Sequence, residues 1–142
     1  MDELKQEKSM VCAVYARSAV SNPSAIELQI EKCCEAAHKR GWVADERYTF
    51  TDDGVSSNKR MHERRGLGAL IAAAVSETPR FDYLLIKDFA RLNRNPGEGV
   101  KMIEAFAQWG VTVYFVDPAL DTSQANAKVI FNVLRALDDK YS

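Results

Sequence analysis

The sequence predicts an α/β fold with a mostly parallel central sheet of about four to five strands, flanked by helices. Two observations support this prediction. Short apolar segments without polar alternation, typical of strands buried on both faces, recur along the chain. Segments with apolar residues at helical spacing separate them, so strands and helices alternate. The 142 residues, 46% of them hydrophobic, suffice for one domain with its own core.

The chain is predicted to open with a flexible polar leader at residues 1–9. Met10–Tyr15 is apolar and is the first predicted strand. A helix follows, because Asn22 and Pro23 are typical of a helix start and Gly41 is typical of a helix end.

The second predicted strand is Trp42–Phe50, and it ends in a turn at Thr51–Gly54. Val55–His62 is polar and is expected to form a mobile loop. The next helix has these apolar positions at helical spacing: Leu67, Leu70, Ile71, Ala74 and Val75.

The second half of the chain repeats the alternation. Tyr83–Lys87 is predicted to be a buried strand, followed by a short helical turn at Phe89–Arg94 and a longer helix. Val111–Val116 is the fourth strand, and a long helix starts at Gln124. Its apolar face, Val129–Leu137, is expected to be exposed and to pair with a second copy in a dimer. Packing against the chain's own sheet is the alternative.

Composition excludes several classes of protein. Lys and Arg number 19 against 20 Asp and Glu, so the net charge is −1 and a globally basic nucleic-acid coat is excluded, although a local basic site is not. No apolar run is long enough to cross a membrane, and no secretion signal is present, so a cytoplasmic protein is expected. Cys12, Cys33 and Cys34 form no CxxC pair, which argues against a disulfide framework and a zinc site; they are expected to be small buried side chains.

In parallel sheets the functional site lies beyond the carboxyl ends of the strands. The corresponding loops here are Ala16–Ser24, Thr51–His62, Asp88–Arg94 and Asp117–Ser123. Residues that bind a ligand or carry out a reaction are therefore expected in these four loops.

Arginines and a hydroxyl gather at the predicted loops. Arg17 and Ser18 follow the first strand, and Arg64 begins the second predicted helix. Arg91 and Arg94, three residues apart, are predicted to share one face of a helical turn. Guanidinium groups match phosphate oxygens, so a hydroxyl among several arginines suits attack on a phosphodiester. No carboxylate cluster has metal-ligand spacing, and neither a metal nor another cofactor is expected.

Less specific interpretations exist for each residue. Loop arginines are often only solvated, and a serine after a strand is often a cap. Neither GxxxxGK[ST] nor GxGxxG occurs, so the usual nucleotide-binding loops are absent. A flavodoxin-like binder of a small anionic ligand remains one alternative.

Taken together, four stretches resemble the catalytic domain of the serine recombinases, the resolvase/invertase family, over residues 10–142. They resemble the family patterns Y-x-R-x-S with a later Gln, F-x-D-x-G-x-S-G, R-P-G-L and K-x-x-[DS]-R-x-x-R. The stretches are Val14–Ala19 with Ile26–Gln29, Phe50–Ser57, Arg64–Leu67 and Leu85–Asn95. The segment from Asp121 resembles the start of the family's long dimerisation helix.

This resemblance implies a serine that attacks a DNA phosphodiester, forms a 5′-phosphoserine link and later lets the strands rejoin without metal or ATP. It implies a homodimer that forms a tetramer around two DNA sites, encoded by a bacterium, a phage or another mobile element. Carried over by position, the arginines bind the phosphate, and Gln29 and Asp52 support the site. These arginines are Arg17, Arg64, Arg91 and Arg94.

One departure concerns the nucleophile. The family serine stands two residues after the arginine, where this chain has Ala19, and Ser18 lies beside Arg17 instead. Three interpretations remain open: Ser18 attacks from an altered loop, Ala19 is an engineered loss, or the protein is a natural member that binds and assembles without cutting. Ser21 and Ser24 are more distant candidates.

A second departure is length. The family carries DNA-binding domains after the catalytic domain, and no such domain fits here. We therefore expect a truncated catalytic domain, with a naturally short protein as the alternative, and in either case weak DNA affinity.

Overall fold

The structure, a computed structural model, describes residues 10–56, 64–76 and 80–141, and the side chains only as far as residue 133. The predicted leader and most of the predicted loop Val55–His62 lie outside the described residues. The strands are β1 (Val11–Ser18), β2 (Val43–Asp53), β3 (Tyr83–Ile86), β4 (Thr112–Phe115) and β5 (Leu120–Asp121). The helices are α2 (Pro23–Lys39), α3 (Arg65–Ala74), α4 (Phe89–Leu92), α5 (Pro96–Gln108) and α6 (Ala125–Tyr141).

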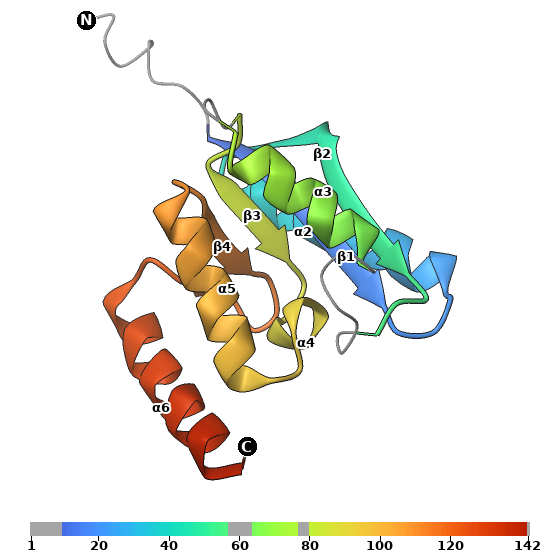
Figure 1. Ribbon diagram of the computed structural model, residues 1–142. Helices are drawn as coiled ribbons and strands as arrows, with labels where there is room; N and C mark the ends of the chain where they lie inside the picture. The colour runs from blue at the N-terminus through green and yellow to red at the C-terminus, as the bar shows by residue number, and fades with distance from the viewer. Residues whose placement is uncertain (1–9, 57–63, 77–79, 142) are drawn as a thin grey trace, which may run out of the picture.

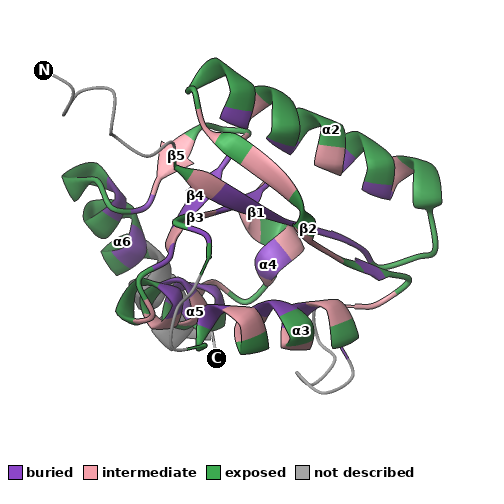
Figure 2. Cartoon of the chain, turned by 90° about the horizontal axis from the view of Figure 1, so that it is seen from above, coloured by how far each residue is buried: buried purple, intermediate pink, exposed green. Residues whose placement is uncertain are grey.

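The five strands form one sheet in the order β2-β1-β3-β4-β5. The first three junctions are parallel, and β5 pairs antiparallel to β4. The α/β prediction with a mostly parallel sheet is confirmed. α2 alone covers one face of the sheet, whereas α3, α5 and α6 lie on the other face (Figures 1 and 2).

β1 and β2 extend further than the apolar residues predicted. Their parallel ladder continues through Arg17 opposite Asp52 and Ser18 opposite Asp53. Backbone pairing does not depend on side-chain polarity, so the ladder persists after the apolar pattern stops. The first residues of the two predicted loops, Ala16–Ser18 and Thr51–Asp53, are therefore the last residues of the strands.

Alternate side chains of β1 enter two separate cores, as the pleat of a strand requires. Tyr15 belongs to the larger core beneath α3 and α5, and Val14 belongs to the smaller core beneath α2. Because Arg17 follows Tyr15 by two residues, it lies on the side of α3. Ser18 lies on the side of α2.

α2 begins where the sequence predicts it. The Asn22 side chain accepts from the backbone N–H of Ala25 at 3.1 Å, and proline occupies the first turn. Cys12 and Cys33 are buried as expected, and burial raises the pKa of each thiol to about 12. The expectation of burial is wrong for Cys34, which is exposed, because a step of one residue along a helix leaves the buried stripe.

α3 crosses β2 so closely that one position must be glycine. A Cβ atom on Gly66 would clash with the carbonyl of Thr51. The same helix ends one residue earlier than its apolar pattern indicated: Val75 is its C-cap and is exposed, not buried as predicted. The close approach brings the first turn of α3 to the carboxyl end of the sheet.

α6 packs through Ala127 and Phe131, which are buried in the larger core beside α5. On its other side Val129, Ile130 and Val133 are exposed, with 64%, 41% and 55% of their surface accessible. The predicted exposed apolar face is confirmed for these three residues. No helix within the described residues is long and apolar enough to span a membrane.

Candidate active site

Arg17 joins three segments at the carboxyl edge of the sheet. It is 1% exposed, and its side chain donates to three backbone carbonyls. Nε donates to Arg91 (2.8 Å), Nη2 to Ala90 (2.7 Å) and Nη1 to Val55 (2.9 Å). α4 is a single turn whose carbonyls find few partners within the helix, so Arg17 supplies the missing donors. Arg17 thereby fixes α4 and the segment after β2 against β1.

Arg64 and Arg91 each keep one buried nitrogen without a partner. Arg64 is 2% exposed, and its Nη2 donates to the Tyr15 hydroxyl at 2.9 Å and approaches the Arg91 carbonyl at 3.4 Å. Nε of Arg91 lies 3.7 Å from an Asp88 carboxylate oxygen, which is too far for a hydrogen bond. Within the described part of the chain, these two Nε atoms are the buried side-chain polar atoms that lack a hydrogen-bond partner. An anion would supply the missing acceptors.

A buried network connects Arg64 to the start of α3. The Tyr15 hydroxyl accepts from Arg64 and donates to Oδ2 of Asp52 at 2.7 Å. The Asp52 carboxylate also accepts from the backbone N–H groups of Gly66 (2.7 Å) and Leu67 (3.0 Å). A carboxylate at these first N–H groups stabilises a helix end, so a residue of β2 caps α3.

Sequence reasoning assigned Asp52 a supporting role but placed it in a turn and missed Tyr15. Asp52 lies in β2 and is 4% exposed. From the sequence, Tyr15 is expected only as a strand residue and as the Tyr of the family pattern Y-x-R-x-S, with no role in the site. Its position two residues before Arg17 was the available signal, because residues i and i+2 of a strand share one face.

Gln29 completes the backbone pairing of β1. β3 ends at Ile86, opposite Tyr15, so the peptide groups of Arg17 have no strand partner on that side. The buried Gln29 amide replaces the strand: Oε1 accepts from the Arg17 N–H (3.1 Å), and Nε2 donates to the Arg17 carbonyl (3.0 Å). Gln29 thus acts on the backbone that carries Arg17.

Burial and mutual repulsion perturb the groups of the cluster. Burial lowers the pKa of Arg17, and the positive charges of Arg64 and Arg91 lower it further. Burial raises the pKa of Tyr15 far above its usual range, so its hydroxyl stays protonated and continues to donate to Asp52. The cluster is therefore a region of crowded positive charge, which favours a bound anion.

Ser18 lies away from the arginines. It belongs to β1, not to an altered loop, and its hydroxyl donates to the carbonyl of Val20. Neighbouring strand residues point to opposite faces, so Ser18 and Arg17 face different sides of the sheet. Ala19 is exposed directly after the strand. The exposed Ser21 donates to Asp53 at 3.2 Å.

The prediction that Arg91 and Arg94 share one helical face is wrong. α4 ends at Leu92, and Asn93 is extended, with φ −164° and ψ 140°. The chain must leave α4 there because Asn95 already caps α5. Arg94 lies exposed in the connection between the two helices.

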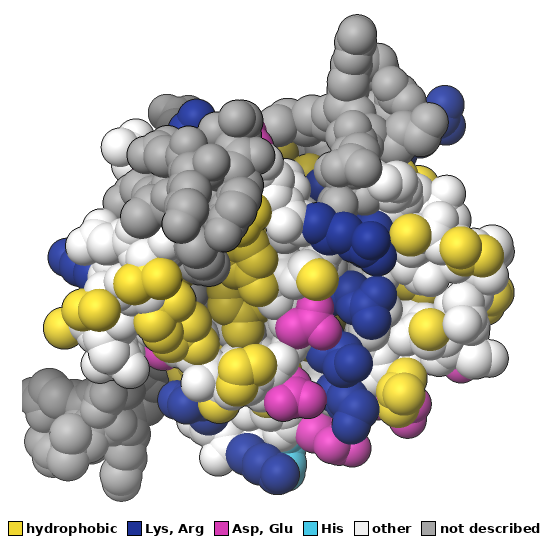
Figure 3. Space-filling model, turned by 90° about the horizontal axis from the view of Figure 1, so that it is seen from below, with side chains coloured by type: hydrophobic (Ala, Val, Ile, Leu, Met, Phe, Trp, Pro, Cys, Tyr) yellow, Lys and Arg dark blue, Asp and Glu magenta, His cyan; other side chains and the backbone are white. Residues whose placement is uncertain are grey.

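Cationic side chains are also visible on the surface at this edge. Viewed from the carboxyl edge of the sheet, Lys and Arg side chains form a row beside a group of acidic side chains (Figure 3). Among the described residues no group of three or more His, Cys, Asp or Glu side chains is arranged to hold a metal ion. The buried N–H groups of Arg64 and Arg91 at this edge remain the donors available to an anionic ligand.

A mostly parallel sheet with buried arginines at its carboxyl edge defines an α/β domain that can receive an anionic group. The family model "Resolvase, N terminal domain" matches residues 12–142, so the chain belongs to the resolvase family through this domain.

Two curated relatives show the same relationship. The R46 site-specific recombinase of Escherichia coli is 29% identical over 123 residues, which cover 87% of this chain and 57% of the relative. The Transposon Tn3 resolvase of Escherichia coli is 28% identical over 123 residues, which cover 87% of this chain and 59% of that relative. The chain thus spans less than two thirds of the length of these relatives.

Solved structures support the fold. The N-terminal catalytic domain of TP901-1 integrase aligns with a TM-score of 0.78 at 25% identity, covering 91% of this chain and 94% of that one. A resolvase family site-specific recombinase from Streptococcus pneumoniae aligns with a TM-score of 0.77 at 19% identity. The alignment covers 92% of this chain and 87% of that one. The fold class and the resemblance to serine recombinase catalytic domains are confirmed.

The cap supplied by Asp52 can be tested through stability. Asp52→Asn leaves one acceptor oxygen for three donors, so we expect the free energy of unfolding to fall by about 2–3 kcal/mol in urea titrations followed by circular dichroism. Asp45→Asn is the control, because Asp45 pairs only with the neighbouring surface residue Arg47 and should leave stability nearly unchanged. Equal losses in both variants would refute the cap.

Proposed function

We propose that this domain binds a DNA phosphodiester at the arginine cluster and is built like the catalytic domains that break and rejoin DNA through a serine. The observation that carries the proposal is the pair of buried Nε groups of Arg64 and Arg91 without acceptors. A buried N–H group without a hydrogen-bond acceptor costs stability, which a bound phosphate would offset. The names of the relatives, a resolvase and a site-specific recombinase, agree with this proposal.

In this proposal Arg64, Arg91 and the exposed Arg94 contact the phosphate, and Arg17 holds them in place. Arg17 already donates to three carbonyls, so its main contribution is to position α4. Positive charge preorganised around a phosphorus centre stabilises the extra charge of the transition state. Asp52 and Gln29 position the helix and strand that carry these arginines.

We propose further that the chain as printed lacks the attacking hydroxyl. Ser18 lies on the side of α2, and its hydroxyl donates a hydrogen bond to the carbonyl of Val20. Position 19 is exposed, lies directly beyond the end of β1 and is two residues after Arg17, where the family pattern Y-x-R-x-S has its serine. Of the three interpretations of the sequence, a lost nucleophile fits this geometry, and the domain then binds and assembles without cutting.

The test is a gain of cleavage. The chain is fused to a DNA-binding module of known site and mixed with supercoiled plasmid carrying paired sites. We expect no covalent adduct with the printed sequence and a 5′-linked adduct at position 19 with Ala19→Ser. Adding Arg91→Gln to that variant should reduce the rate at least about a hundredfold.

Ser18→Ala is the matched control in the Ala19→Ser background and should leave adduct formation unchanged. Mass spectrometry identifies the modified residue. An adduct on Ser18 in the printed sequence would contradict the assignment of position 19.

We propose that the exposed side of α6 forms a homodimer, as a first step toward a tetramer on DNA. Val129, Ile130 and Val133 would otherwise stay in water. Val133→Lys should raise the dimer dissociation constant at least about tenfold in sedimentation equilibrium, because a charge is costly in an apolar interface. Lys128→Gln, an exposed change on the same helix, is the control; equal effects would contradict the assignment.

A further inference from the structure

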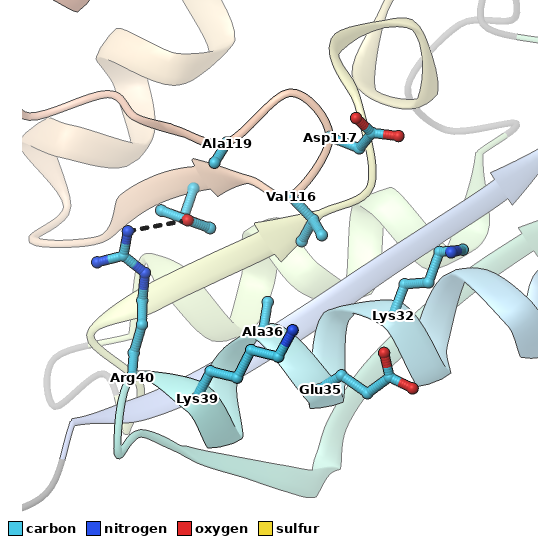
Figure 4. Close-up of a pocket in the computed structure, with 9 residues that line it drawn as sticks. Lys32, Glu35, Ala36, Lys39, Arg40, Val116, Asp117 and Ala119 are labelled. Carbon is cyan, nitrogen blue, oxygen red and sulfur yellow. Dashed lines mark hydrogen bonds between the residues drawn. The ribbon is translucent and has the colours of Figure 1, made fainter.

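A cleft on the α2 side adjoins the carboxyl edge but contains none of the arginines described above (Figure 4). It lies between α2 and the segment after β4 and has a volume of about 350 Å³. Tyr114 and Val116 line it from the sheet side. The N–H of Asp117, also in its wall, donates to the carbonyl of Lys87 at 2.8 Å, so the cleft begins beside the residue that follows β3.

Three cations border this cleft: Lys32 and Lys39 of α2, and Arg40, the residue that caps the end of α2. All three are exposed, and none of them forms an ion pair with another described residue. Glu35 and Asp117 are the acidic residues of the lining. The cleft therefore has an excess of positive charge, although the whole chain has a net charge of −1.

Arg40 is held in place before any ligand binds. Its Nη2 donates to the Tyr114 hydroxyl at 2.9 Å, and its guanidinium carbon lies 4.4 Å from the Tyr114 ring centroid and 5.2 Å from that of Trp42. Stacking on aromatic rings orients a guanidinium while leaving other N–H groups free. A fixed donor loses little conformational entropy when it binds a phosphate.

We propose that Lys32, Lys39 and Arg40 hold phosphates of the DNA that flanks the bond bound at the arginine cluster. The inference rests on the proposed function and adds a second contact surface to it. Lys and Arg side chains form a row on the surface seen from the carboxyl edge (Figure 3). DNA bound at the arginine cluster on this edge would extend toward α2 and the cleft.

Spacing along α2 suits successive phosphates. Lys32 and Lys39 are seven residues apart, which is about 10 Å along a helix axis. The two ammonium groups are therefore far enough apart to contact two different phosphates of one duplex. The neighbouring Glu35 repels phosphate and limits the affinity of this surface.

The test measures how DNA binding depends on salt. The 142-residue chain is titrated into a short fluorescent duplex by anisotropy, over a salt series that starts at low ionic strength. The proteins are the unmodified chain, Lys32→Gln with Lys39→Gln, Glu35→Gln, Arg91→Gln, and Lys101→Gln. Lys101 is an exposed residue of α5, paired with Glu98 at 3.6 Å, and serves as the control.

Each lost phosphate contact lowers the slope of log K against log salt by about 0.9, so the double lysine variant should lose about 2 in slope relative to the control. Glu35→Gln should bind DNA more tightly than the unmodified chain. Circular dichroism verifies that the exposed substitutions leave the fold intact.

An unchanged slope in the double variant, with weaker binding by Arg91→Gln, would overturn the second surface and leave the arginine site standing. In that case the cleft would not bind DNA, and a segment of a protein would be its expected occupant. If no protein binds the duplex even at low salt, the second surface is overturned, and the cleavage test with Ala19→Ser decides the proposed function separately.

Discussion

The buried guanidinium of Arg17 is the interaction on which the candidate site depends. It connects β1 to two carbonyls of α4 and to the carbonyl of Val55. A one-turn helix has little stability of its own, so α4 keeps its place through these bonds and its packing. Gln29 pairs with the peptide groups of Arg17 from the other layer. The position of Arg91 is therefore set by a residue from a different part of the chain.

A second buried group couples the other arginine to the sheet. Tyr15 bridges Arg64 and Asp52, and Asp52 caps α3, so the start of α3 and the direction of Arg64 are fixed together. Among the described residues, Asp52 is the one buried carboxylate, beside two almost fully buried guanidiniums, those of Arg17 and Arg64. Such an imbalance lowers stability in the free protein and is expected where an anionic ligand supplies the missing charge.

The sequence was sufficient for the fold, because uninterrupted apolar strands and amphipathic helices alternate regularly, as in Tyr83–Lys87 and α5. It was less informative at the ends of β1 and β2, where the ladder continues through polar residues such as Arg17 and Asp52. For that reason the sequence predicts Ser18 in a loop, whereas the structure has it in β1. The capping of α3 by Asp52 joins residues far apart in sequence, and no local pattern reveals it. At Arg94 the sequence predicts too much regular structure: the helical spacing of Arg91 and Arg94 suggests one helix, but α4 ends at Leu92.

The central claim is that the unpartnered Nε groups of Arg64 and Arg91 receive a phosphodiester. It is tested most directly by nuclear magnetic resonance of arginine Nε–H signals while a short DNA duplex is added to the chain. The account predicts that the Arg64 and Arg91 signals shift markedly. The Arg17 signal should shift little, because its Nε already donates to a carbonyl. Shifts no larger than that of the surface residue Arg47, or confined to it, would contradict the account.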